Sequence, residues 1–451
     1  MGRPATAAAA DVRGSDSSFT ARSIRGPSPL RNLDRIVPPM SSRTPENGGR
    51  AVIFLGGIFT PNQIGMIQSK SIGVVQNAAD ALQKNFIHGI SLACPGKVSV
   101  VNLPYVNSCP RGFKLAYFPR TEETIFSDVF VNGQAFITIQ FIKSFSRAWS
   151  ALSGLFRVDS TRKSTIVIYA AHNPFLVASI LYRCLFAPQS RICLILPDLP
   201  EFMGEGGILY KIVTFVNSTI FYRLARYIDA FVLLTEPMAE RLRLSDDKYI
   251  VVEGVADTTG FGNVNHPDNE TRPCSFLYTG TLAARYGIME LVHAFTKIRD
   301  QEVELWICGD GDCKAQISEW VHRDPRIRFF GQISRDEARA LQQRASVLVN
   351  PRRPHGEFTR YSFPSKTLEY MAAGRPVLMH RLAGIPEDYL PYIVQPATAD
   401  VDGFSRAMAT LAKLPASELD RMGHSARQFV DQNKTEAQQG RRVAQLIANL
   451  K

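Results

Sequence analysis

Short apolar segments alternate with segments of helical periodicity from residue 51 onward. The apolar segments lack regular polar alternation, which is typical of strands buried on both faces. Between them, apolar residues recur at helical spacing, as Ala79, Leu82 and Phe86 do within 76–90. The strands predicted in the amino-terminal half lie at 51–57, 98–104, 165–172, 191–198, 229–236 and 248–254.

The same alternation starts again at Cys274 and ends in three helical segments. Strands separated by helices form parallel sheets that are covered on both faces. The sequence therefore predicts an α/β protein with two doubly wound domains in tandem. The segments predicted in this half are strands at 274–280, 303–308, 326–331, 346–351 and 375–379, and helices at 288–298, 335–345, 365–374, 404–414, 417–433 and 438–450.

Composition divides the chain into five parts. Residues 1–49 are rich in Ala, Ser, Pro and Arg without periodicity, and we predict a disordered basic tail. Residues 50–262 are predicted to form the amino-terminal domain. Residues 263–272 lie in a polar stretch rich in Gly, Pro and Asn, which is typical of a linker. Residues 273–430 are predicted to form the carboxyl-terminal domain, and residues 431–451 the final helix.

The chain of 451 residues carries a formal net charge of +11, which favours an anionic partner. Nucleic acid, a membrane surface and a phosphorylated substrate all fit this charge. No helix-turn-helix, zinc-finger or RNP-like signature points to nucleic acid. No apolar run reaches the roughly 18 residues that a membrane-spanning helix needs. The seven cysteines form no C-x-x-C pair, which favours free thiols.

Three predicted strand ends in the second half share a binding chemistry. Open α/β sheets bind ligands at the carboxyl ends of their strands. Gly280 and Arg285 follow the first of these strands, and Gly309 and Gly311 follow the second. A basic loop after the third strand leads to Ser365, where a helix begins. Glycines let a ligand approach the backbone closely, so these loops are candidates for a phosphate site.

The stretch YSFPSKTLEYMAAGRPVL places one acid, Glu369, in an apolar helix. Free N–H groups at the helix start near Ser365 suit a diphosphate, and Lys366 and Arg285 could add charge. Glu369 lies about one turn further on and could accept hydrogen bonds from paired ribose hydroxyls. The alternative is that Glu369 complements its own helix dipole from solvent, as acids in first turns commonly do.

The chain resembles GT-B glycosyltransferases of family 4 over residues 51–450. The matching pieces in the second half are YTGTL, LWICGDGD, FFGQIS, SVLVNPR and SFPSKTLEYMAAGRPVL. FLGGIFTP, LILPDLPEFM and IVVEG in the first half are similar to a branch typical of bacterial capsular and exopolysaccharide biosynthesis. The resemblance implies two Rossmann-like domains facing a cleft, with the carboxyl-terminal helices packing back. It also implies that residues 50–262 bind the acceptor and residues 273–430 the nucleotide sugar.

The resemblance implies a retaining glycosyltransferase of the hexosyltransferase type. Its donor is a nucleotide-diphosphate sugar, which is a co-substrate, and no cofactor is expected. Its acceptor is a hydroxyl group of a glycan or of a lipid-linked molecule. No His/Cys/Asp cluster of metal-ligand spacing is evident, so we expect metal independence. We expect a cytoplasmic protein, peripheral on the inner face of the plasma membrane.

The sequence departs from the family pattern at two places. The family often carries two glutamates eight positions apart, and here Tyr361 stands where the first would be. Glu357, on the same loop, could take over its contact with the donor sugar, or could be a solvated acid. Thr281 and Tyr286 occupy the positions of an arginine and a lysine that bind the diphosphate, which leaves Arg285 as the nearest cation.

The resemblance places the acceptor and the transfer chemistry in the first half. His172 ends a predicted strand and matches a histidine that many family members hold near the transferring sugar. Gly56 and Gly57 end the first strand and could bring the backbone close to the reacting groups. Asp198 and Glu201 follow another strand and could bind acceptor hydroxyls. Each of these residues also has a structural reading, as a packed histidine, a tight turn or a loop cap.

Alternative functions remain open at the level of sequence. A nucleotide-sugar epimerase or hydrolase can share this fold, and the charge also fits a non-enzymatic basic binding protein. Residues 125–149 and 208–228 combine aromatic, aliphatic and basic side chains. Such stretches suit contact with a membrane surface, or packed helices whose basic side chains reach solvent.

Overall fold

The structure of the chain is a computed structural model. It describes residues 50–73, 75–202, 207–258, 260–262 and 273–450. The predicted tail 1–49 and the predicted linker 263–272 lie outside the described residues. The domain bounds proposed from the sequence stay predictions.

The amino-terminal lobe is built on a sheet of eight strands in the order β10-β9-β8-β7-β1-β2-β5-β4. Neighbouring strands are parallel except for β4 and β5, which are antiparallel. A separate antiparallel pair is formed by β3 (Tyr117–Phe118) and β6 (Phe136–Ile137). The sheet strands are β1 (Val52–Gly56), β2 (Val98–Asn102), β4 (Thr121–Ile125), β5 (Val129–Gly133), β7 (Thr165–Tyr169), β8 (Arg191–Leu196), β9 (Ala230–Leu233) and β10 (Tyr249–Val251).

Both faces of this sheet are buried, as the apolar pattern predicts. Successive side chains of a strand point to opposite faces, and β1 shows the consequence. Ile53 and Leu55 belong to one hydrophobic cluster, and Val52 and Phe54 belong to another. The helices of this lobe are α1 (Pro61–Lys70), α2 (Asn77–Ala93), α3 (Lys143–Val158), α4 (Asn173–Leu185), α5 (Ile208–Leu224) and α6 (Glu236–Leu242).

The carboxyl-terminal lobe has a parallel sheet of six strands in the order β13-β12-β11-β14-β15-β16. Phe276 and Leu277 of its first strand contribute to clusters on opposite faces, so this sheet too is doubly covered. Its strands are β11 (Cys274–Thr279), β12 (Val303–Cys308), β13 (Ile327–Gly331), β14 (Val347–Asn350), β15 (Val377–Met379) and β16 (Ile393–Val394). Its helices are α7 (Ile288–Thr296), α8 (Lys314–Arg323), α9 (Arg335–Arg344), α10 (Lys366–Ala372) and α11 (Val401–Ala412).

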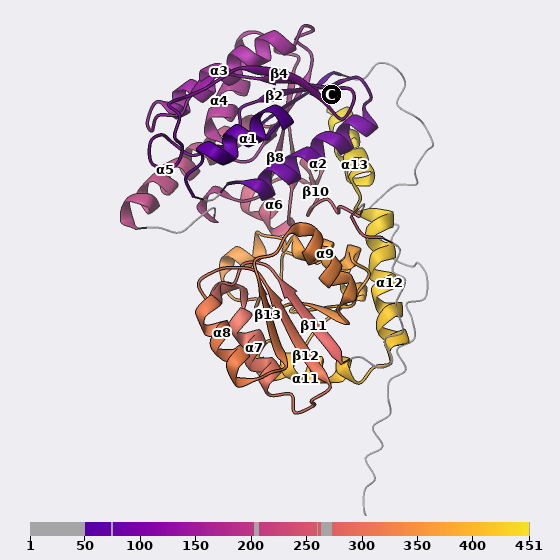
Figure 1. The fold of residues 1–451 in the computed structure, drawn as a ribbon. Coiled ribbons are helices and arrows are strands. Elements are labelled where there is room, and N and C mark those ends of the chain that lie inside the picture. Colours follow the sequence, from indigo (N-terminus) through magenta and orange to yellow (C-terminus); the bar gives the residue numbers. More distant parts are fainter. Residues whose placement is uncertain (1–49, 74, 203–206, 259, 263–272, 451) are drawn as a thin grey trace, which may run out of the picture. The chain divides into compact units, whose positions relative to one another are not determined.

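The chain ends in α12 (Ala416–Asn433) and α13 (Glu436–Ala448), and α13 packs against α2 (Figure 1). The approach is so close that a Cβ atom on Gly440 would lie 2.0 Å from the carbonyl oxygen of Gly89. Next to it, Nδ1 of His88 lies 2.5 Å from a carboxylate oxygen of Glu436. The prediction that the carboxyl-terminal helices pack back is confirmed.

A buried ion pair joins the segment after β10 to the segment between α12 and α13. Lys434 Nζ lies 2.6 Å from Glu253 Oε1 and 2.9 Å from Asp388 Oδ2. Lys434 and Glu253 are 5% and 3% exposed. Beside them, Ala256 and Thr435 form a parallel β-bridge. Within the described ranges, no helix is both long and apolar enough to cross a membrane.

Candidate active site

The strand order of each sheet reverses at one point. In the carboxyl-terminal sheet the reversal lies between β11 and β14, and in the amino-terminal sheet between β1 and β7. Connections leave such neighbouring strands on opposite sides of the sheet, which opens a crevice at their carboxyl ends. Gly56, Gly57, His172, Gly280 and Arg285 lie at or after the ends of β1, β7 and β11, and Ser365, Lys366 and Glu369 lie between β14 and β15. The adjacent strands carry the others: Asp198 and Glu201 follow β8, and Gly309 and Gly311 follow β12.

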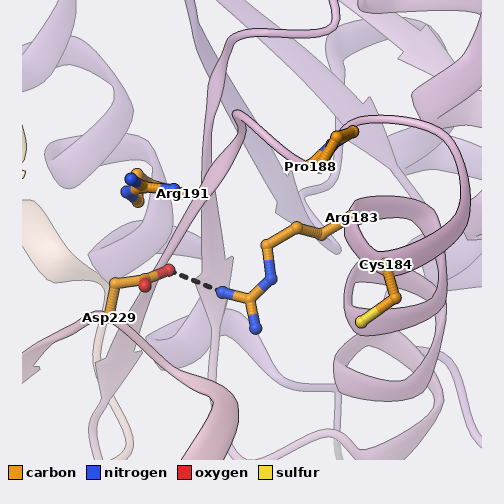
Figure 2. Close-up of a pocket in the computed structure, with 5 residues that line it drawn as sticks. All are labelled: Arg183, Cys184, Pro188, Arg191 and Asp229. Atoms are coloured by element: carbon orange, nitrogen blue, oxygen red, sulfur yellow. Dashed lines mark hydrogen bonds and ion pairs between the residues drawn. The ribbon is translucent and has the colours of Figure 1, made fainter. Parts of the chain in front are cut away.

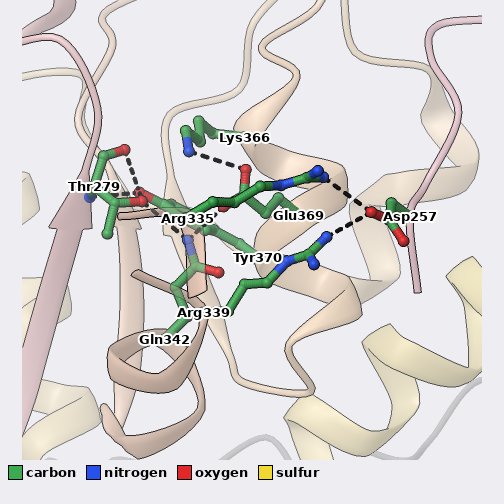
Figure 3. A network of polar contacts seen from close by, with 8 residues as sticks. All are labelled: Asp257, Thr279, Arg335, Arg339, Gln342, Lys366, Glu369 and Tyr370. Carbon is green, nitrogen blue, oxygen red and sulfur yellow. Dashed lines mark hydrogen bonds and ion pairs between the residues drawn. The ribbon is translucent and has the colours of Figure 1, made fainter. Parts of the chain in front are cut away.

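Glu369 on α10 has two close partners (Figure 3). Its Oε2 lies 2.9 Å from Lys366 Nζ, and its Oε1 accepts a 2.7 Å hydrogen bond from Gln342 Nε2. Burial works to raise the pKa of the Glu369 carboxyl group, but Lys366 and Gln342 outweigh it, and the pKa lies below its ordinary value. Glu369 is therefore an ionised acceptor at neutral pH, fixed in position and half-buried.

Gln342, which sequence reasoning did not single out, connects this acid to the end of β11. The side chain is fully buried, and its Nε2 also donates to Thr279 Oγ1 at 3.0 Å. The hydroxyl of Tyr370 accepts a 2.9 Å hydrogen bond from the N–H of Thr279. Gln342 Oε1 has no hydrogen-bond partner among the described residues. A glutamine in a polar helix gives no local signal of this role.

The glycines of the two loops pack against each other. A Cβ atom on Gly309 would lie 1.8 Å from the carbonyl oxygen of Gly280, and both residues have positive φ. The N–H of Gly280 donates to Cys308 O at 3.0 Å, and the N–H of Leu282 to Asp310 O at 2.9 Å. Gly311 likewise approaches the backbone of Leu282. The glycines allow backbone-to-backbone packing that sets the shape of the loops.

The other donor-side residues lie near the surface. Ser365 is exposed and precedes α10, but its side chain makes no capping hydrogen bond. Since α10 has only seven residues, the case for this site rests on the side chains of Lys366 and Glu369 more than on a helix dipole. Thr281 is exposed, and exposed Arg285 lies over the ring of Tyr286 at 5.0 Å.

Arg352 is a second residue that sequence reasoning missed, although the basic loop that contains it was recognised. It is 7% exposed, and its Nη2 donates to Ser362 Oγ at 2.6 Å. Burial lowers its pKa, and the charges of Arg285 and Asp198 also act on it. Arg352 therefore lies within electrostatic range of residues predicted on both sides of the site.

Tyr361 and Glu357 have different environments. Tyr361 is buried, belongs to the hydrophobic cluster of the amino-terminal lobe and stacks on Phe202 with ring centroids 5.2 Å apart. Glu357 begins the short helix η7 (Glu357–Arg360) and is exposed. No contact made by either residue supports or opposes the proposed role of Glu357 toward the donor sugar, which stays a prediction.

His172 lies three residues after the end of β7, immediately before α4. Its ring packs edge-on against Tyr105, with centroids 5.7 Å apart, and at a tilt against Phe175, with centroids 4.2 Å apart. Its Nδ1 atom is buried and has no hydrogen-bond partner in the part of the chain that the structure describes. Burial, and then the charges of Arg147 and Lys143, hold its pKa well below the ordinary value. The imidazole is therefore neutral at pH 7.

Arg147 is the buried cation beside this histidine, and it is 1% exposed. Its two terminal nitrogens donate to the carbonyl oxygens of Leu103 and Pro104, both at 2.8 Å. Its guanidinium lies 4.9–5.3 Å from the centroids of three aromatic rings. Burial lowers the pKa of Arg147 to about 10. Among the described residues no carboxylate pairs with it, so the surroundings of His172 are electropositive.

Neighbouring segments of the chain pack tightly against Gly56, the last residue of β1, and against Gly57, which follows it. The N–H of Gly57 donates to Gln83 Oε1 at 2.8 Å. A Cβ atom on Gly57 would lie 2.5 Å from Leu103 O, and one on Gly56 would lie 2.5 Å from Gln83 Oε1. These contacts support the reading of both glycines as a tightly packed strand end.

Asp198 and Glu201 follow β8. Asp198 is exposed, yet partial desolvation raises the pKa of its carboxyl group while Arg352 works in the opposite direction. Glu201, in the short helix η2 (Pro200–Phe202), accepts a 2.7 Å hydrogen bond from the Tyr222 hydroxyl and pairs with Arg241 at 3.3 Å. Asp198 is thus the freer of the two to meet an acceptor.

A surface hollow at the other end of the amino-terminal sheet is separate from these residues (Figure 2). Arg191 begins β8 and Asp229 immediately precedes β9, so the hollow lies at the amino ends of the strands. The side chain of Arg183 reaches across it to Asp229 at 2.8 Å. The residues lining it are Arg183, Cys184, Pro188, Arg191 and Asp229. None of them was predicted as a site residue.

In the ranges that the structure covers, no three His, Cys, Asp or Glu side chains are grouped so that they could hold a metal ion. Metal independence and the lack of a cofactor stay predictions.

Residues 273–413 match the family model described as glycosyl transferases group 1. The sequence has no significant match among curated proteins. The matched segment covers β11 to β16, the loops with Gly280, Gly309 and Gly311, and the Lys366–Glu369 pair.

Solved structures of similar fold cover both lobes. Anabaena HepE (Alr3699) in complex with UDP has a TM-score of 0.56 and 12% identity, over 89% of this chain and 100% of that chain. WaaB, a lipopolysaccharide outer core galactosyltransferase, has a TM-score of 0.59 and 13% identity, over 88% and 98%. Sucrose-phosphate synthase from Thermosynechococcus elongatus has a TM-score of 0.57 and 16% identity, over 88% and 100%.

At these identities the solved structures show the fold alone. The fold is that of the GT-B glycosyltransferases, with two Rossmann-like domains, as predicted. The match of residues 273–413 to glycosyl transferases group 1, together with this fold, identifies the protein as a glycosyltransferase.

Proposed function

We propose that the protein is a retaining, metal-independent glycosyltransferase of family 4 that acts in bacterial capsular or exopolysaccharide biosynthesis. Its donor is a nucleotide-diphosphate hexose, and its acceptor is a hydroxyl group of a glycan or lipid-linked molecule. HepE binds UDP, and WaaB is a galactosyltransferase of lipopolysaccharide, which supports this choice. The protein acts in the cytoplasm, peripherally on the inner face of the plasma membrane.

One observation carries the proposal. The acid Glu369 is held ionised by Lys366 and Gln342 within the segment that matches glycosyl transferases group 1. A carboxylate fixed in this way can accept two hydrogen bonds from the paired hydroxyls of a ribose. Lys366, on the same turn, can then exchange its carboxylate partner for a phosphate oxygen. In this proposal Glu369 binds the ribose and Lys366 binds a phosphate of the same nucleoside diphosphate.

The donor loops complete this site in our proposal. The backbone after Gly280 and Gly309, the hydroxyl of Thr281 and the side chain of Ser365 face the diphosphate. Arg285 contributes a positive charge that stabilises the leaving group, which is electrostatic preorganisation.

Transfer in our proposal is a same-face displacement. The bond between the anomeric carbon and the phosphate oxygen breaks, and its electron pair stays on the diphosphate. The acceptor oxygen bonds to the anomeric carbon from the same face, and its proton passes to the departing phosphate oxygen. Neutral His172 lies beside the sugar and donates or accepts one hydrogen bond there, while Asp198 binds the acceptor.

The donor can be found by thermal unfolding of the protein with UDP-, GDP- and dTDP-sugars. A ligand at a hundred times its Kd stabilises the folded state by about 2.7 kcal/mol. We expect one base to raise the unfolding temperature, and Glu369→Ala to reduce the rise clearly at the same ligand concentration. Glu319→Ala, an exposed acid on α8, is the matched control. If no nucleotide sugar stabilises the protein, or if Glu369→Ala responds fully, the proposed site is wrong.

The transfer itself is tested by incubating the stabilising donor with and without glycan and lipid-linked acceptors. Retention of anomeric configuration is read from the product by NMR. Consumption of the donor at the same rate without any acceptor would favour a hydrolase or epimerase instead.

A further inference from the structure

Exposed large apolar side chains are distributed unevenly over the protein. In the carboxyl-terminal lobe, as far as it is described, Phe330 is the one such side chain, at 40% exposure. In the amino-terminal lobe they concentrate on three neighbouring helices, α3, α4 and α5. Exposed apolar residues scattered singly are normal, but a concentration of them marks an interaction surface.

Helix α5 carries the densest group. Its outermost members are Ile208 and Phe215, at 81% and 73% exposure. At about 100° of rotation per residue, the exposed residues cover more than half of the helix circumference. A helix that is apolar on so many sides is normally buried, so it needs a partner that can surround it. The exposed apolar residues of α5 are Ile208, Tyr210, Ile212, Val213, Phe215, Val216 and Ile220.

The start of α3 presents a second stripe. Phe141, Phe145 and Trp149 are 86%, 79% and 73% exposed. The last two are spaced by four residues within α3, so they lie on one side of the helix, and Phe141 precedes them by four more. These side chains contribute nothing to the lobe's core.

Helix α4 joins the two stripes into one layer. Phe156 of α3 packs edge-on against Tyr182 and Phe186 at the far end of α4, with centroids 5.1 Å and 4.6 Å apart. Asn173, at the start of α4, donates a 3.0 Å hydrogen bond to Asn217 O of α5. The outward surface of α3, α4 and α5 is called here the apolar face.

The charged residues of α3, α4 and α5 themselves have one sign. The sequences of α3, α4 and α5 contain no Asp or Glu. Arg157, Lys211 and Arg223 on these helices are exposed cations. A face that combines apolar side chains with basic residues alone is complementary to an anionic lipid surface.

We propose that the apolar face docks on an anionic lipid bilayer. The side chains of α5 and of the start of α3 enter the boundary between head groups and acyl chains, and Lys211 and Arg223 meet lipid phosphates. A bilayer surrounds the protruding side chains of α5 from several directions, which one flat protein surface cannot do. The absence of acids from α3, α4 and α5 favours lipid over a second copy of this chain, since self-association through these helices gains nothing from one sign of charge.

The inference extends the proposed function by naming the partner of the acceptor side. His172 immediately precedes α4, and Lys143, whose charge acts on His172, begins α3. Two helices of the apolar face, α3 and α4, therefore begin beside the residue proposed for transfer. An acceptor anchored in the bilayer would reach that residue from the docked surface.

The test uses the full chain and vesicles of phosphatidylcholine with or without phosphatidylglycerol. We expect the protein to float with the anionic vesicles, and its tryptophan fluorescence to shift to shorter wavelength. Trp149 lies on the apolar face, while Trp306 and Trp320 lie in the other lobe. The shift should therefore be lost in Trp149→Phe.

Two sets of variants locate the contact. Phe145→Ser with Phe215→Ser removes two exposed side chains, and we expect about tenfold or more weaker partitioning. Phe330→Ser is the matched control and should partition like the parent. Lys211→Gln and Arg223→Gln should each reduce the preference for anionic vesicles about fivefold. Thermal unfolding checks that every variant is folded.

Three outcomes would overturn the inference: no binding to anionic vesicles, unchanged binding of Phe145→Ser with Phe215→Ser, or equal binding to vesicles with and without phosphatidylglycerol. Dimers that the same double variant dissolves, without vesicle binding, would make the apolar face a self-association surface. Stabilisation by a nucleotide sugar is measured separately. Vesicle binding without any response to nucleotide sugars would leave this inference standing and remove the proposed function.

Discussion

Lys366 Nζ lies 2.9 Å from Glu369 Oε2, on the same turn of α10. Each side chain neutralises the other in the free protein. A bound diphosphate would draw Lys366 away, while Gln342 still holds the other oxygen of Glu369 at 2.7 Å. Because a half-exposed ion pair contributes little to the stability of the fold, losing this pair costs the protein little. Lys366 can therefore exchange Glu369 for a phosphate when the donor binds.

The first prediction concerns the two ends of this pair. Glu369→Ala should weaken binding of the nucleotide sugar about 10- to 100-fold, because charge-assisted hydrogen bonds contribute about 1.5–3 kcal/mol. Gln342→Ala should weaken it about fivefold, through a carboxylate that is less well fixed. Isothermal titration calorimetry gives both values.

The variant Lys366→Met tests whether Lys366 contacts the phosphates of the donor and not its base or ribose. It should weaken binding of the nucleoside diphosphate more than binding of the nucleoside. Equal losses for the two ligands would place Lys366 away from the phosphates.

The second prediction concerns the pH dependence caused by His172. Its pKa in the folded protein lies well below the ordinary value near 6.5. The unfolded chain therefore binds this proton more readily, so the free energy of unfolding should fall as the pH drops below about 6.5. The slope is at most about 1.4 kcal/mol per pH unit for each such histidine. His380, whose pKa burial lowers to about 4, adds to the effect.

His172→Asn should therefore flatten the dependence of stability on pH between about 6.5 and 5. His424→Asn, which changes an exposed histidine, should leave it unchanged. Denaturant unfolding at several pH values gives the comparison. An identical slope for parent and His172→Asn would mean that the buried imidazole titrates normally.

The sequence predicted the fold well because the apolar periodicity of each segment is a local property. The runs at 165–172 and 274–280 contain the observed strands β7 and β11. Strand order was not encoded locally, but alternating strands and helices restrict it to a few parallel topologies.

The candidate site was only partly predictable. Glu369 and Lys366 lie in a recognisable stretch, and the structure brings them together with Gln342. Gln342 lies 27 positions before Glu369, and its burial depends on how α9 packs. Likewise, nothing local marks Arg147 as a cation buried among aromatic rings beside His172. Such relationships arise from tertiary packing, which periodicity does not describe.

The third prediction concerns the buried ion pair of Lys434 and Glu253. Lys434→Met leaves the Glu253 carboxylate buried without its cation, so the free energy of unfolding should fall by about 3–5 kcal/mol. Lys297→Met breaks an exposed pair with Asp402 and should change stability by less than about 1 kcal/mol. Chemical denaturation distinguishes the two. Similar small losses would show that the Tyr389 hydroxyl, which donates to Glu253 Oε1, and water already satisfy the buried carboxylate.

The last prediction compares a glycine that the donor loops need for close packing, Gly309, with a glycine in a helix that has open space around it, Gly65. Gly309→Ala places a methyl group 1.8 Å from the carbonyl oxygen of Gly280, at a positive φ of 141°, so the two loops must move apart. Gly65→Ala lies in helix α1, where a Cβ atom meets nothing within 4 Å. It should stabilise the protein by about 0.5–1 kcal/mol, because alanine favours the helix. Gly309→Ala should instead destabilise it and weaken binding of the nucleotide sugar. If Gly309→Ala lowers stability without changing that affinity, the glycine loops shape the fold and do not contact the donor.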